Sequence, residues 1–213
     1  MDHNHHMSGS TNAMAVSATL HCLTGCAIGE ITGLMIGTAL GLANLATIAL
    51  AIALAFLFGY ALSTLPLLRA GLGVSAALGV VLAADTLSIA TMELVDNVVM
   101  AVIPGAMDAG LVNPTFWVSM MLALTVAFFA AWPVNRWLLA RGKGHALTHD
   151  FHGAEPQGAR RFIPALGTTT LVAAIVAFML GGLVVSIADR IDAPDEPAGT
   201  HTLNSPSRET VHP

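Results

Sequence analysis

Apolar residues form five long runs, which are separated by short stretches rich in glycine, proline and polar residues. The runs cover about residues 15–41, 44–66, 74–103, 115–139 and 163–187. A helix needs about 20 apolar residues to cross the hydrocarbon core of a bilayer, and it pairs its own backbone polar groups there. We therefore predict an all-α bundle of five transmembrane helices. A flexible His-rich segment at 1–14 and a flexible acidic tail at 188–213 are expected to flank it.

Composition agrees with this pattern, because 55% of the 213 residues are hydrophobic and only 10% are charged. A soluble domain typically carries about 25% charged residues. The length leaves no room for a large enzyme domain beside five spans, so a non-enzymatic role is favoured. The few basic residues lie mostly in one loop. They give no sign of a nucleic-acid partner, and the lipid bilayer is the expected surrounding.

Basic residues also predict the orientation, since Lys and Arg gather on the cytoplasmic side of membrane proteins. They cluster around the connection between the fourth and fifth runs, at Arg136, Arg141, Lys143, Arg160 and Arg161. The connection between the third and fourth runs has Asp108 and no basic residue. We therefore expect the N-terminus in the cytoplasm and the C-terminal tail outside.

Glycine recurs every fourth residue along the first run, at Gly25, Gly29, Gly33, Gly37 and Gly41. Small residues at this spacing let a second helix approach closely, and close packing drives helix association in lipid. We interpret the stripe as a packing groove. A second copy of the chain or another membrane protein is its expected occupant.

A second stripe of the first run carries Cys22, Cys26 and Glu30, which are also four residues apart. At 100° per residue they drift by about 80° in total, so they share one narrow face beside the glycines. His21 lies on the other side of the groove. A carboxylate costs about 2.5–3.5 kcal/mol at the centre of a membrane helix, so Glu30 needs a partner, a proton or a function.

These thiols, the imidazole and the carboxylate together suit a Cu(I) or Zn(II) ion. The plain alternative is that the cysteines are packing residues and that a protonated Glu30 forms a hydrogen bond to a neighbouring helix. The sequence leaves both interpretations open.

The third run carries three carboxylates, Asp85, Glu93 and Asp96, at membrane depth. Asp85 and Asp96 share one face with Ser88 and Met92, and the adjoining edge carries Glu93, Asn97 and Met100. Carboxylates in a membrane helix indicate a polar pathway, a proton relay or an ion site. Interhelical hydrogen bonds between partly protonated carboxyls are the alternative.

Helix rise relates the two polar faces, because each residue advances the chain by about 1.5 Å. If both helices run outward, Cys26 lies level with Asp85, and Glu30 lies near the level of Ser88 to Met92. We predict that the faces meet, with the thiols nearer the cytoplasm and the carboxylates beyond them. Two histidine groups could add metal ligands on the same side, although such loops can equally be solvated turns. They are His3, His5 and His6, and His145, His149 and His152.

Three stretches of the chain, HCLTGCAIGEITG, ADTLSIATMELVDN and WPVNRWLLARGKGHA, resemble bacterial integral-membrane proteins filed as domain of unknown function 4396. The likeness covers about residues 15–150. It implies a multi-pass domain in a bacterial inner membrane, and it brings no established activity. It also supports a set of polar residues as family-type positions. They are His21, Cys22, Cys26, Glu30, Asp85, Glu93, Asp96 and Asn97.

The leading hypothesis is a small membrane protein that binds, and can translocate, a transition-metal cation, with copper favoured and zinc as the other choice. Its metal ligands would be His21, Cys22, Cys26, Glu30 and Met92. Its onward polar or proton path would be Asp85, Ser88, Glu93, Asp96 and Asn97. The competing hypothesis is a structural or assembly subunit of a larger membrane complex, which uses the glycine groove and the polar faces as contact surfaces. A thiol redox protein is a third possibility, although two cysteines four apart in one helix are poorly placed for a low-strain disulfide.

Overall fold

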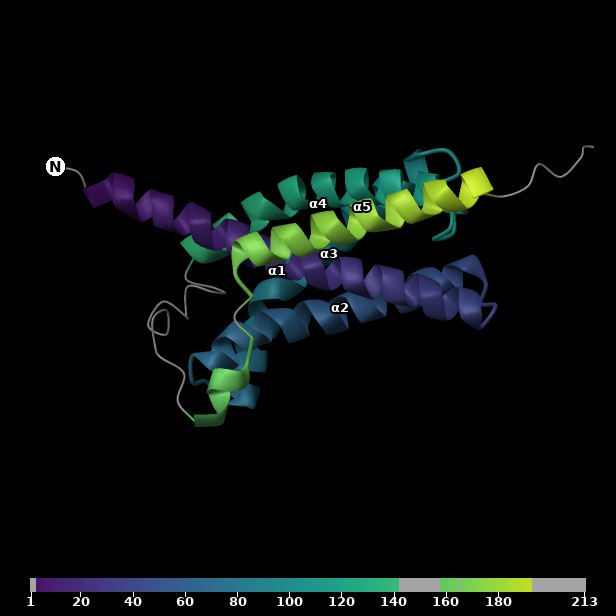
Figure 1. The fold of residues 1–213 in the computed structure, drawn as a ribbon. Helices are drawn as coiled ribbons and strands as arrows, with labels where there is room; N and C mark the ends of the chain where they lie inside the picture. The colour runs from purple at the N-terminus through teal and green to yellow at the C-terminus, as the bar shows by residue number, and fades with distance from the viewer. Residues whose placement is uncertain (1–2, 142–157, 165, 193–213) are drawn as a thin grey trace, which may run out of the picture.

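The structure is a computed structural model that describes residues 3–141, 158–164 and 166–192. Its long helices are α1 (His3–Ala39), α2 (Asn44–Arg69), α3 (Val74–Val102), α4 (Pro114–Ala140) and α5 (Thr168–Asp192) (Figure 1). A short 3₁₀ helix, η2 (Gly158–Phe162), precedes α5. Each long helix contains a stretch that is long and apolar enough to cross a membrane, and the described residues form no strand. The all-α, five-span fold is therefore confirmed.

Helix ends follow local sequence signals. Gly41 and Gly71 have positive φ angles of 62° and 110°, which let the chain reverse within a few residues after α1 and α2. Asn113 caps α4 by accepting a hydrogen bond from the Thr115 N–H at 3.0 Å, with Pro114 at the first helical position. Helix α1 is longer than its apolar run, so residues 3–14 are helical where a flexible segment is expected. Helix α5 begins and ends five residues later than its run.

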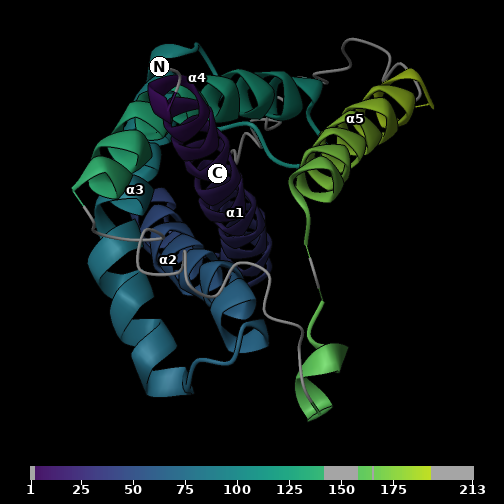
Figure 2. The same cartoon turned by 90° about the vertical axis from the view of Figure 1, so that its left-hand side faces the viewer.

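Helix α1 is the centre of the bundle and contacts each of the other long helices. Figure 2 looks along the bundle and shows α1 beside α2, with α3 and α4 on one side. Helix α5 stands apart from α2 and α3, and its main contacts are with α1 and α4. The buried core therefore lies mainly between α1, α3 and α4.

The glycine stripe of α1 packs directly on α2. A Cβ atom added at Gly29 would lie 2.5 Å from the backbone carbon of Leu54 and closer still to the backbone of Ala55. The same holds along the stripe, where Gly25 faces Gly59, Gly33 faces Ala51 and Gly37 faces Thr47.

This packing corrects the expected use of the groove. Its occupant is α2 of the same chain, so Gly25, Gly29, Gly33 and Gly37 are not available to a second copy or to another protein. Gly41 lies in the turn after α1, and a Cβ atom there would meet nothing within 4 Å. The small residues of α1 therefore build the fold itself.

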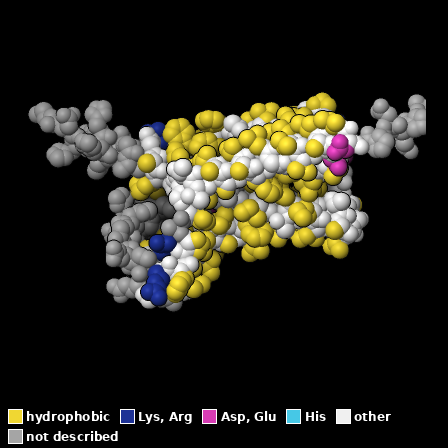
Figure 3. All heavy atoms as spheres, in the orientation of Figure 1, with side chains coloured by type: hydrophobic (Ala, Val, Ile, Leu, Met, Phe, Trp, Pro, Cys, Tyr) yellow, Lys and Arg dark blue, Asp and Glu magenta, His cyan; other side chains and the backbone are white. Residues whose placement is uncertain are grey.

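Charged side chains gather at the two ends of the bundle, and the surface between them is mostly hydrophobic (Figure 3). At one end Arg69 donates a 2.7 Å hydrogen bond to the carbonyl of Ile163, which ties the end of α2 to the segment before α5. At the other end Arg190 donates to Asn113 Oδ1 at 2.7 Å. An apolar band between charged ends is the surface of a multi-pass membrane protein in contact with lipid. The cytoplasmic location of the N-terminus remains a prediction.

Candidate functional site

The cysteine stripe of α1 faces α3, directly beside the glycine face that packs on α2. Cys22, Cys26 and Glu30 are buried, as are the three carboxylates of α3, and none of the six side chains is more than 8% exposed. Because α1 and α3 run in the same direction, their polar groups meet in succession along the bundle. We call the resulting series the polar line, and it consists of Cys22, Cys26, Glu30, Asp85, Ser88, Glu93 and Asp96.

The first level of the polar line surrounds Cys22. Its sulfur lies 3.6 Å from the hydroxyl oxygen of Ser63 on α2. It also interacts with the side chains of Asp85 and Ser88 on α3. All four residues are at most 1% exposed. Three helices therefore supply one small cluster of polar groups that is closed to the lipid.

The second level lies one turn further along α1, at Cys26. This thiol lies close to the carboxyls of Glu93 and Glu30. Neither oxygen of Glu93 has a hydrogen-bond partner among the described residues, although the side chain is only 4% exposed. Buried polar atoms are normally paired, so a buried carboxyl without a partner calls for a proton, a water or an ion.

The third level pairs two carboxyls. The side chains of Glu30 on α1 and Asp96 on α3 lie close together. An ionised carboxylate can only accept hydrogen bonds, so two neighbouring carboxyls can bond to each other only when one of them carries a proton. One oxygen of each group, Glu30 Oε2 and Asp96 Oδ1, has no hydrogen-bond partner in the described structure.

A cavity of about 90 Å³ adjoins this pair at the end of the bundle where the α1–α2 and α3–α4 connections lie. Glu30, Glu93, Asp96 and Asn97 contribute to its lining. The Asn97 amide donates a 2.8 Å hydrogen bond to the carbonyl of Glu93 on its own helix. The carboxyl end of the polar line therefore opens into space that can hold water.

The expected metal ligands do not come together. The described residues include no group of three His, Cys, Asp or Glu side chains that could hold a metal ion. Four residues of helix rise by about 6 Å, so Cys22, Cys26 and Glu30 occupy three successive levels, whereas zinc binds its ligands at about 2.0–2.3 Å. His21 Nδ1 is 2.8 Å from the carbonyl of Ser17 on its own helix.

Met92 and the two histidine groups are the remaining expected metal ligands. Met92 is buried in the core at 1% exposure, where it packs among apolar side chains. The histidines at 145, 149 and 152 lie outside the described residues, and the side chains of those at 3, 5 and 6 are not described either.

The register between α1 and α3 differs from the expected one by one to two helical turns. Cys22, rather than Cys26, meets Asp85, and Glu30 meets Asp96 rather than the level of Ser88 to Met92. The expected register placed the start of each apolar run at the same height. Helix α1 starts well before its apolar run, and its packing against α2 sets its height instead.

Two polar contacts of the site region were not expected from the sequence. Ser63 is the hydroxyl beside Cys22, and it is one of the few small polar residues of a mostly apolar helix. Asn135 of α4 donates a 2.8 Å hydrogen bond to the hydroxyl of Thr19, three residues before Cys22. The amide of Asn135 inside an apolar run was the available signal, because such a group needs a partner in a bilayer.

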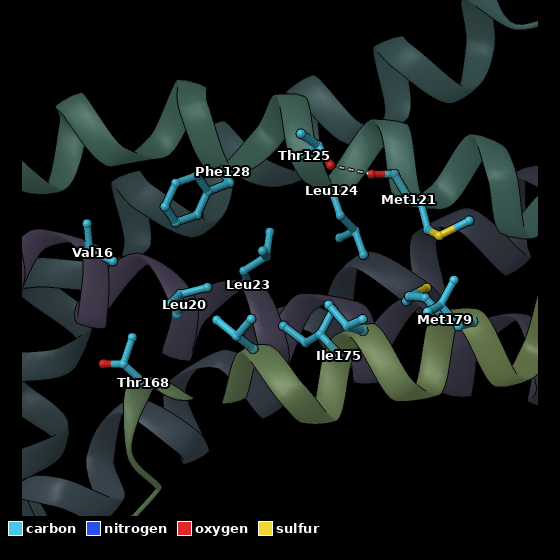
Figure 4. A pocket seen from close by; sticks show the side chains of 13 residues that line it. Val16, Leu20, Leu23, Met121, Leu124, Thr125, Phe128, Thr168, Ile175 and Met179 are labelled. Carbon is cyan, nitrogen blue, oxygen red and sulfur yellow. Dashed lines mark hydrogen bonds between the residues drawn. The ribbon is translucent and has the colours of Figure 1, made fainter. Parts of the chain in front are cut away.

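A second hollow, between α1, α4 and α5, has a different character. A groove of about 520 Å³ lies between α1, α4 and α5 (Figure 4). Leu20, Leu23, Phe128 and Ile175 face it, and the Thr125 hydroxyl bonds back to its own helix. This groove holds no titratable group, so the chemistry of the described protein is concentrated in the polar line.

The comparison with protein families gives one match, to the family described as "Domain of unknown function (DUF4396)", over residues 11–144. No match was found among curated proteins or among solved structures. The matched region runs from the first membrane turns of α1 through α4, so it contains the whole polar line, and α5 lies outside it. Since it covers well over half of the 213 residues, the chain belongs to the DUF4396 family.

Proposed function

We propose that this membrane protein moves a small cation, with the proton as the simplest case, along the polar line between α1 and α3. The observation that supports the proposal is the Glu93 carboxyl, which is buried at the middle level with no hydrogen-bond partner for either oxygen. A carboxyl kept only for packing would be paired, because an unpaired buried polar group costs about 1–3 kcal/mol. Ionisable groups inside a membrane bundle commonly mark a route for protons or ions.

The spacing of the levels suits transfer in short steps. Each level lies about 6 Å from the next along α1, so the line from Cys22 to Glu30 spans about 12 Å. A hydrocarbon core is about 30 Å thick, so the line covers roughly two fifths of it. The adjoining cavity extends the route toward one end of the bundle. Toward the other end the next buried polar groups are Thr19 and Asn135.

Proton flux into liposomes tests the proposal. The purified chain would be reconstituted with a pH-sensitive dye inside the vesicles and driven by a potassium diffusion potential. Asp96→Asn removes a buried carboxyl of the polar line while keeping the size of the side chain. We expect it to reduce the flux about tenfold or more, which corresponds to about 1.4 kcal/mol of added barrier.

Asp189→Asn is the matched control, because it makes the same change at an exposed position of α5. It should leave the flux unchanged. Equal flux from wild type and from Asp96→Asn, with both above empty vesicles, would contradict the proposed route. Wild-type flux no greater than that of empty vesicles would contradict the proton as cargo.

A transition-metal ion is a more specific cargo for the same route. The thiols of Cys22 and Cys26 support it, because thiolates are soft ligands that favour Cu(I) and zinc. Metal analysis of the purified wild type against Cys22→Ser/Cys26→Ser tests this form. Equal metal content would remove the thiols from metal binding and leave the proton path untouched. The structural-subunit alternative has lost its main surface, since α2 fills the glycine groove.

A further inference from the structure

We propose that the cavity at the carboxyl end of the polar line binds a soft monovalent cation of the Cu(I) or Ag(I) class. The lining that carries this inference is a set of carboxyls and thioethers. These residues are Glu30, Glu93, Asp96, Met100, Met107 and Met120. The proposal goes beyond the proposed function, because binding in the cavity does not require conduction along the line.

The carboxyl side of the cavity points to a positively charged ligand. Glu30, Glu93 and Asp96 are each more than nine-tenths buried, and each has at least one oxygen without a hydrogen-bond partner in the described structure. A buried anionic group is stabilised by a proton or by a cation. One of these carboxyls, once it has lost its proton, can balance the charge of an entering monovalent cation.

The methionines distinguish between classes of cation. Met100 of α3 and Met120 of α4 are buried, and Met107 in the connection between these helices is 39% exposed. They line the cavity from three successive parts of the chain. Thioethers are soft ligands that select Cu(I)-like ions over Mg²⁺, Ca²⁺ or Mn²⁺, which prefer oxygen. Methionines in a purely apolar core are explained by packing alone. The methionines of this cavity lie beside carboxyls, so packing alone does not explain them.

The ligand set disfavours the harder ions. Zinc would need three or four His, Cys, Asp or Glu ligands together, and the described residues contain no such group. Mg²⁺ prefers oxygen ligands and gives up its waters reluctantly, so it gains nothing from the methionines. A soft ion held by sulfur and one carboxylate fits this ligand set.

Charge balance gives the binding step a second readout. An entering monovalent cation can take the place of a proton on one of the neighbouring buried carboxyls, Glu30 or Asp96. That proton then leaves to solvent, so the net charge of the cavity does not change. Binding should therefore release about one proton per cation.

Silver ion is the probe, because it has the softness of Cu(I) without its oxidation by air. The full-length protein would carry Cys22→Ser and Cys26→Ser, so that the two thiols do not contribute. Equilibrium dialysis with metal analysis would compare this background with the same chain carrying Met100→Leu and Met120→Leu. Leucine for methionine conserves volume and is usually tolerated in a core.

The control pair is Met121→Leu with Met179→Leu, two methionines that line the apolar groove between α4 and α5 instead. Other groups of the chain, including the N-terminal histidines, give every variant the same background. We expect the cavity pair to bind silver about tenfold more weakly at one site per chain, and the control pair to match the background. Equal binding by the two pairs would show that the cavity methionines only fill space and would overturn the proposal.

A single Met107→Leu variant keeps the test decisive if the cavity pair fails to fold, since this partly exposed side chain is removed without disturbing the buried core. It should also weaken silver binding and reduce proton release. Proton flux in liposomes separates this inference from the proposed function. Absent silver binding with intact flux refutes only the cation site, and absent flux with intact silver binding refutes only the path.

Discussion

Replacing Gly29 with alanine tests the contact on which the whole arrangement depends. Gly29 lies in the middle of the α1 stripe, where the backbone of α2 passes directly over it. The added methyl carbon would lie 2.5 Å from the backbone carbon of Leu54 and closer still to the backbone of Ala55. These are main-chain atoms, so no side-chain rotation can make room.

The required displacement sets the expected magnitude. Non-bonded carbons pack best at about 3.5–4.0 Å, so the two helices must separate by about 1 Å or more at this level. Overpacking of a tight interior typically costs about 1–3 kcal/mol. We expect Gly29→Ala to lower the free energy of unfolding by that amount, toward its upper end, because backbone rather than side chains must move.

Unfolding in mixed micelles with increasing SDS, followed by helix content, measures this loss. Gly79→Ala is the matched control, since it lies on an exposed face of α3 with nothing within 4 Å of the added atom. Alanine is the better helix former by about 1 kcal/mol in soluble helices, so the control should be neutral or slightly stabilising. If Gly29→Ala unfolds at the same SDS fraction as Gly79→Ala, the α1–α2 contact is not as close as described.

Two more predictions concern burial and α5. Both cysteines of the chain are free and buried, so a membrane-permeant maleimide should label the folded protein slowly and label it fully after denaturation in SDS. Rapid labelling of the native protein would show that the thiols are not buried. Gly182→Ala should push α5 away from α4, because the added carbon would lie 2.5 Å from Cε2 of the Trp117 ring, and a red shift of tryptophan fluorescence would report the change. Its neighbour Gly181 has nothing within 4 Å, so Gly181→Ala should leave the spectrum as in the wild type.

The spans were predictable because length and apolarity are direct properties of the sequence. A bilayer demands about 20 apolar residues per helix and allows no unpaired backbone, which leaves little freedom in the assignment. Helix ends were less predictable for the same reason. Beyond the hydrocarbon core apolarity no longer limits a helix, so α1 extends over residues 3–14 without any hydrophobic signal.

The faces of the polar site were predictable, and their register was not. Periodicity near 3.6 fixes which residues of one helix share a side, and both the Cys22–Glu30 face and the Asp85–Asp96 face meet in the structure. Periodicity within a helix says nothing about its height relative to another helix. The observed offset of one to two turns is set by how the helices pack.

The glycine groove was predictable, whereas its occupant was assigned to the wrong molecule. A signal for the true occupant was present in the sequence. Helix α2 carries its own small residues at every fourth position, namely Thr47, Ala51, Ala55, Gly59 and Ser63. Helix α2 follows α1 after a short turn and runs antiparallel to it. Its matching stripe of small residues therefore meets the glycine groove before a second chain can.

The two stripes of α1 are linked, because the glycine stripe determines where the polar stripe points. With its glycines on α2, α1 has only one orientation, and the adjacent Cys22–Glu30 face then turns toward α3. The same close approach brings the Ser63 hydroxyl of α2 to 3.6 Å from the Cys22 sulfur, which a wider helix pair would not allow. Packing and chemistry are therefore coupled through one helix. A separation of about 1 Å at Gly29 should disturb the polar line as well as the fold, so proton flux should fall in Gly29→Ala even under conditions where the protein remains folded.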